Sequence, residues 1–142
     1  MQVFICSSVH LFIKHSQSTM SKQKLIEGFH PEKSRVNSAA LADFIRSPIT
    51  GDLGQVPGIG PATIVRLKAA GVDTTFALIG KYLTLKTGGV ESVEHQDRFY
   101  FWLTSLDTVS GYRAGICQAI AEKVNTFMPG IYDGDVYCCC CN

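Results

Sequence analysis

The sequence has little charge and almost no excess of either sign. Its 142 residues include 13 Lys+Arg and 12 Asp+Glu, a net charge of +1. This balance excludes a polybasic coat, so any nucleic acid would be bound through a few placed contacts. The chain also lacks a long apolar run, because residues 3–13 are interrupted by Ser7, Ser8 and His10 and are shorter than the ~20 residues of a bilayer span. A transmembrane protein is therefore not expected, whereas an apolar fraction of 46% is enough for a buried core.

The sequence also lacks cysteines spread along the chain, which a disulfide scaffold would need. Four of the six stand in one run, Cys138 to Cys141, with Cys6 and Cys117 apart. Neighbouring cysteines cannot connect distant segments, so a reducing compartment is predicted. For the run we weigh prenylation, a metal site and a reactive tail. A C-a-a-X box would need two aliphatic residues after Cys139, and four cysteines in a row cannot easily surround one metal ion, so the reactive tail is favoured. No metal or other cofactor is expected.

The start of the chain does not have the order of a secretory signal. Its first positive charge, Lys14, follows the apolar part instead of preceding it. Met20 offers an alternative start, because the sequence from there is polar and basic, as is typical of intracellular proteins. We therefore expect three parts: a flexible extension over residues 1–36, a helical domain over 37–128 and a flexible Cys-rich tail over 129–142.

The apolar spacing between residues 37 and 128 is that of helices, not strands. Asn37 and Thr74 are predicted helix caps, and Pro61 fits the first position of a helix. The helix after Thr74 is expected to be the most buried. The pattern predicts an all-α fold, a compact bundle of five or six helices, in these segments: from Asn37 to Ser47, Leu53 to Pro57, Pro61 to Gly71, Thr74 to Thr87, around Phe99 to Leu106, and from about Ser110 to Met128.

The most informative segment is Gly58-Ile59-Gly60, between the second and third of these helices. Two glycines favour a turn too tight for a Cβ, and they leave the backbone amides open to a large group. Those amides lie at the start of the helix that begins with Pro61, where the dipole favours an anion. Ile59 is expected to anchor the turn in the core, and Arg66 to reach a neighbouring phosphate. The whole resembles a helix-hairpin-helix motif, which binds the DNA backbone independently of sequence.

Other interpretations of the same residues are less well supported. The glycines do not form the dinucleotide fingerprint G-x-G-x-x-G, because position 63 is Thr and no strand precedes them, and a P-loop is absent. A DNA glycosylase of this motif class would have a lysine at Ala62 and a longer chain. Cys117 with His95 suggests a nucleophile and base. The spacing, however, places Cys117 on the apolar side of the last helix, and the acidic neighbours of His95 indicate a solvated helix face. We therefore expect no enzyme.

Beyond the turn, a longer pattern narrows the interpretation. It runs Leu78-Ile79-Gly80-Lys81-Tyr82-Leu83-Thr84-Leu85-Lys86, followed by Phe99-x-x-Trp102-Leu103. Together with a short first helix that ends before Pro48 and the G-I-G turn, this order resembles the barrier-to-autointegration factor family of small chromatin proteins. The resemblance covers roughly residues 38–128.

The resemblance implies a compact SAM-like bundle that acts as a homodimer. Each protomer would hold double-stranded DNA by its phosphates, so that the dimer bridges two duplexes in chromatin or nuclear organisation. It implies the nucleus as location, with the cytoplasm as a second, and LEM-domain proteins of the nuclear envelope as further partners; no small-molecule substrate is expected. The DNA-binding residues that it implies are Gly58, Ile59, Gly60, Ala62 and Arg66 at the turn, and Gly111 and Arg113 at the start of the last helix.

The chain departs from the family at the first helix. A lysine that the family uses on DNA falls near Ala40 here. The lost charge weakens the DNA interpretation unless the basic residues Lys33 and Arg35 replace it. The near-neutral charge and Ala40 favour an alternative of another class, a helical bundle that binds proteins and not DNA, in which the G-I-G turn only reverses the chain.

Overall fold

The computed structural model describes residues 28–138, and this part of the chain forms five α-helices, three 3₁₀ turns and no strand. The predicted all-α bundle is thereby confirmed. The elements in chain order are η1 (Pro31–Lys33), α2 (Ser38–Arg46), η2 (Leu53–Gln55), α3 (Pro61–Ala69), α4 (Thr75–Thr84), α5 (Ser92–Ser105), α6 (Ser110–Phe127) and η3 (Asp135–Tyr137). The expectations for residues 1–27, including Met20, and for Cys139 to Cys141 lie outside the described residues.

The two predicted helix caps are confirmed by local hydrogen bonds, whereas α5 begins at Ser92, earlier than the expected start around Phe99. The side chain of Asn37 accepts a hydrogen bond from the Ala39 amide at 2.7 Å, and that of Thr74 accepts one from the Ala77 amide at 3.1 Å. Both therefore satisfy a backbone donor that the first turn of a helix leaves free. The segment before the G-I-G turn differs from the expectation: it is the single 3₁₀ turn η2, not an α-helix.

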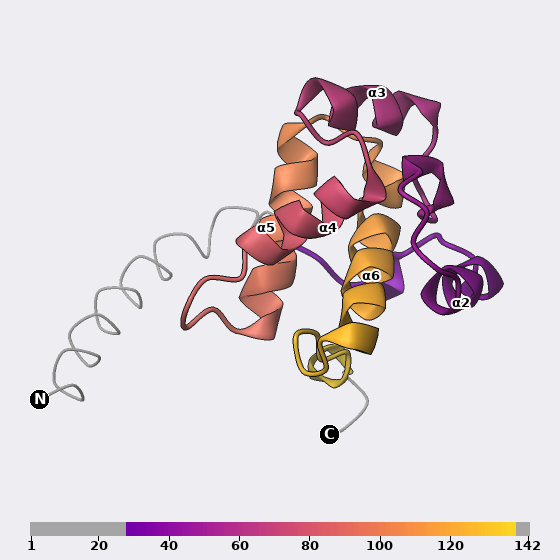
Figure 1. The fold of residues 1–142 in the computed structure, drawn as a ribbon. Coiled ribbons are helices and arrows are strands. Elements are labelled where there is room, and N and C mark those ends of the chain that lie inside the picture. The colour runs from indigo at the N-terminus through magenta and orange to yellow at the C-terminus, as the bar shows by residue number, and fades with distance from the viewer. Residues whose placement is uncertain (1–27, 139–142) are drawn as a thin grey trace, which may run out of the picture.

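The centre of the bundle is α6, not α4 as the sequence analysis expected. Nine of the 18 residues of α6 are buried, against four of the ten residues of α4. In Figure 1, α6 runs through the middle of the molecule, with α5 on one side and α2 on the other. The physical reason is that α6 carries small residues around its circumference, such as Gly115, Ala119 and Ala121, so neighbours approach it from several directions.

The packed region is larger than the expected range 37–128. Phe29, before the first helix, and Tyr132 and Tyr137, after the last, are all buried. The Phe29 ring meets the Tyr137 ring edge to face at 5.3 Å, and the Phe29 amide donates to an oxygen of Asp97 at 2.9 Å. Residues 28–36 and 129–138 thus belong to the folded domain, because aromatic residues attach them to it.

A buried lysine connects α6 to the end of α2. The ammonium group of Lys123 donates to the carbonyl oxygens of Phe44, at 3.0 Å, of Ile45, at 2.8 Å, and of Ser47. These carbonyls belong to the last turn of α2, which has no donors of its own for them. Lys123 therefore caps α2 from another helix, and this explains a charged residue in the core.

His95 is fully buried, so the expectation of a solvated histidine was wrong. Its Nε2 lies 2.7 Å from the carbonyl oxygen of Tyr82, and its Nδ1 has no hydrogen-bond partner within residues 28–138. Burial is the main cause that lowers the pKa of His95, and the positive charges of Lys86 and Arg98 lower it further. The hydrogen bond to the Tyr82 carbonyl oxygen acts in the opposite direction and raises it. The neutral ring with its proton on Nε2 is the form that this site accommodates.

His95 should make the folded state sensitive to acid. Since its pKa is lower in the folded than in the unfolded chain, its contribution to stability is complete above the unfolded pKa of about 6.5 and falls as the pH decreases below it. Urea denaturation at about pH 7.5 and about pH 5 should show a larger loss of unfolding free energy for the wild type than for His95→Gln. An equal loss in both would contradict the assignment.

Candidate functional site

The G-I-G turn requires a glycine at its first position only. Gly58 has φ +93°, a backbone conformation that residues with a Cβ rarely adopt, and an added Cβ would lie 3.2 Å from Cγ1 of Ile116 and 3.4 Å from the carbonyl oxygen of Tyr112. Ile59 is buried, as expected for its role as anchor. Gly60 has φ −101° and open space at its Cβ position. The expectation that the turn itself needs both glycines was therefore wrong.

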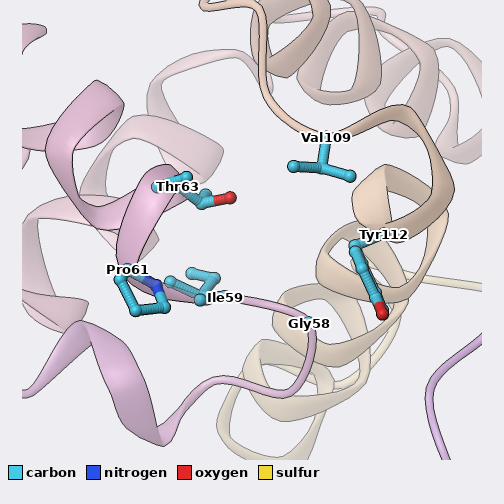
Figure 2. Close-up of a pocket in the computed structure, with 8 residues that line it drawn as sticks. Gly58, Ile59, Pro61, Thr63, Val109 and Tyr112 are labelled. Atoms are coloured by element: carbon cyan, nitrogen blue, oxygen red, sulfur yellow. The ribbon is translucent and has the colours of Figure 1, made fainter.

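A pocket of about 350 Å³ lies between this turn and the start of α6. One wall consists of the turn and the first residues of α3, and the other of Val109 and Tyr112. Figure 2 shows Val109 and Tyr112 across the opening from Ile59, Pro61 and Thr63. The structure therefore places the G-I-G turn opposite the start of α6, although the expected residues Gly111 and Arg113 do not themselves line the pocket.

The two helices that begin at this pocket are not capped by side chains. Gly60, which has no side chain, precedes α3, and Val109, whose side chain has no acceptor atom, precedes α6. The first amide of α3 with a backbone acceptor is that of Ile64, so the Ala62 and Thr63 amides have no acceptor in the described part of the chain. Free amides and the dipoles of both helices give the pocket a partial positive charge.

Thr63 adds a side-chain donor that sequence reasoning missed. The residue is only 3% exposed and lines the pocket, and its hydroxyl has no hydrogen bond to any residue that the structure describes. In Figure 2 its oxygen points towards the opening. The hydroxyl oxygen itself is not fully buried but opens onto the pocket, where solvent or a ligand can bind it. The only signal in the sequence was a polar residue three positions after Gly60, where an apolar one would also suit the helix.

The expected basic residues are present but engaged within the protein. Arg66, exposed on α3, pairs with the exposed Asp107 at 3.4 Å. Arg113 is half-buried, and its guanidinium donates to the side chain and the carbonyl oxygen of Thr108. Arg66 thus has a use within the protein that does not depend on a phosphate. Arg113 also fixes the loop before α6 instead of standing free as a charge.

The remaining expected residues lie beside these. Ala62 is exposed on the first turn of α3, and Gly111 lies in the first turn of α6.

Cys117 is fully buried, as its helix position predicted, and burial raises the pKa of its thiol well above the ordinary value, which disfavours the reactive thiolate. Between residues 28 and 138 no group of three or more His, Cys, Asp or Glu could hold a metal ion, and no helix there is long and apolar enough to cross a membrane.

Comparison with known proteins gives no relative for this chain: no protein-family model, curated protein or solved structure matches it.

The free hydroxyl of Thr63 can be tested by stability. Thr63→Val should leave the free energy of unfolding within about 0.5 kcal/mol of wild type, because no hydrogen bond within the protein is lost. The matched control is Thr75→Val: Thr75 is also buried, but its hydroxyl donates to the Asp52 carbonyl oxygen at 2.7 Å. Losing that bond should cost about 1–2 kcal/mol in chemical denaturation. Equal costs would show that Thr63 has a partner.

Proposed function

We propose that the protein is a non-enzymatic, sequence-independent binder of double-stranded DNA that contacts backbone phosphates. The observation that carries the proposal is the convergence of two uncapped helix starts on one pocket that also contains the unpaired Thr63 hydroxyl. All of these groups are donors, and a phosphate oxygen is an acceptor with negative charge, which the helix dipoles favour. Phosphates are the same at every base pair, so such contacts carry no sequence information.

The affinity of one protomer should be weak. With a net charge of +1 and few contacts, the protein should bind in the 10⁻⁴–10⁻⁶ M range that is typical of non-specific complexes at physiological salt. The resemblance to barrier-to-autointegration factor adds a homodimer that bridges DNA in the nucleus, with LEM-domain proteins as further partners. If both sites of a dimer engage, avidity would raise the apparent affinity by roughly 10²–10⁴.

One observation favours the alternative, a helical bundle that binds proteins and not DNA. Arg66, which the DNA proposal would place on a phosphate, already has a partner in Asp107. This pair is exposed, however, and exposed ion pairs contribute only about 0–1 kcal/mol, so a phosphate can compete for the guanidinium. The protein-binding alternative does not explain why free donors gather at the pocket.

Binding to a labelled duplex tests the proposal directly. Fluorescence anisotropy with the full chain should give similar affinities for unrelated sequences, and three phosphate contacts would give a roughly 40-fold loss between about 50 mM and about 200 mM salt. No binding at low salt by a folded sample would reject DNA binding and favour the protein-binding alternative.

Gly60→Asp should abolish this binding without harming the fold. Gly60 is the residue before α3 and has open space at its Cβ position, so Asp there can cap the Ala62 and Thr63 amides and repel a phosphate. Gly60→Asn caps without the charge and should weaken binding less. Gly88→Asp, at another glycine with open space in the loop between α4 and α5, adds the same charge away from the turn and should leave most of the affinity. Wild-type affinity of Gly60→Asp would contradict the site.

Asp107→Asn should strengthen DNA binding. The change releases Arg66 and removes a negative charge, and Asn tolerates the φ of +56° at this position. We expect a gain of about twofold to fivefold, the factor that corresponds to an exposed ion pair. The control is Asp43→Asn, which releases Arg46 on α2 in the same way and should change the affinity less. A loss of affinity in Asp107→Asn would place Arg66 outside the interface.

A further inference from the structure

Residues 34–36 form a strap that is fixed between the G-I-G turn and α6. The Val36 side chain occupies the space that Gly115 leaves open, where an added Cβ would overlap Cγ2 of Val36. The same Cγ2 atom lies 3.5 Å from the Cβ position of Gly58. The Val36 amide also donates to the hydroxyl of Ser34 at 3.3 Å, which shapes the strap locally. Its position is therefore defined by packing on two other segments.

This strap places Arg35 against the first turn of α6. Its guanidinium lies over Gly111, with Nη1 3.3 Å from the Cβ position of that glycine. Arg35 is exposed and borders a surface depression of about 440 Å³ that Ser110 and Gly111 also line. This depression and the pocket adjoin along the chain at the start of α6, because Ser110 and Gly111 line the first and Val109 and Tyr112 line the second.

Arg35 differs from the other four arginines in having no hydrogen-bond or ion-pair partner within residues 28–138. Arg46 pairs with Asp43, Arg66 with Asp107 and Arg98 with Glu94, and Arg113 bonds to Thr108. Among the residues that the structure describes, no carboxylate and no carbonyl oxygen bonds to the Arg35 guanidinium. Its five N–H donors are thus available, and their fork geometry matches the oxygens of a phosphate.

We infer that Arg35 binds a DNA phosphate beside the start of α6, and that the strap is part of the DNA-binding surface. The inference rests on the proposed function and adds to it the residue that supplies the free positive charge. It also assigns a purpose to the close packing at Gly115: the strap holds Arg35 at one place instead of leaving it on a tail. A charge-assisted, bidentate contact of this kind is among the strongest that a single side chain makes to a phosphate.

The test compares two arginines of the full chain in the anisotropy assay. Arg35→Gln should lower the slope of log K against log salt by about 0.9 and the affinity by about eightfold at 0.1 M salt, the effect of one lost phosphate contact. Arg46→Gln removes the same charge from α2, where the arginine is exposed and paired, and should change neither value by much. Both variants are first checked for wild-type thermal unfolding.

The outcomes separate this inference from the proposed function. If the wild type binds DNA and Arg35→Gln keeps its slope and affinity, the inference is wrong while DNA binding stands. Equal losses in Arg35→Gln and Arg46→Gln would also overturn it, since only net charge would matter. If the wild type does not bind, the proposed function itself fails. A loss specific to Arg35→Gln supports the strap as part of the surface.

Discussion

The candidate site depends on the packing of Val36 into the space left by two glycines. Gly115, in the middle of the central helix α6, has no side chain where Val36 lies, and Gly58 brings the turn before α3 against the same valine. Three segments that are distant in sequence therefore meet at one side chain. Because protein interiors are close-packed, a single added methyl at Gly115 would move the strap and with it the arrangement of the turn and α6.

Two of the described α-helices satisfy such donors with a capping side chain, whereas α3, α5 and α6 do not. Asn37 and Thr74 cap α2 and α4, and Lys123 from α6 covers the carbonyl end of α2. The starts of α3 and α6, which meet at the pocket, have no such cap. Leaving backbone donors free reduces stability, and local departures of this kind are expected where a protein binds something. The same free donors are what a phosphate would need.

Local features of the fold could be predicted from the sequence, and features that depend on distant contacts could not. The caps Asn37 and Thr74, the start of α3 at Pro61 and the buried Ile59 follow from short-range rules and are confirmed. The central place of α6 and the packed segment at Phe29 depend on neighbours far along the chain. His95 looked solvated because its sequence neighbours are acidic, yet the fold covers it. For the site, the turn was predictable, whereas the free hydroxyl of Thr63 is visible only once its surroundings are known.

The most direct test of the account is to see which amides of the folded protein sense DNA. In a ¹H–¹⁵N NMR titration of the full chain with a short duplex, the largest shifts should fall on the amides of Gly60, Ala62 and Thr63 at α3 and of Ser110 and Gly111 at α6. Those of the capped helix starts of α2 and α4 should change little. Shifts confined to other surfaces, or none at all at low salt, would contradict the claim that the two uncapped helix starts bind phosphate.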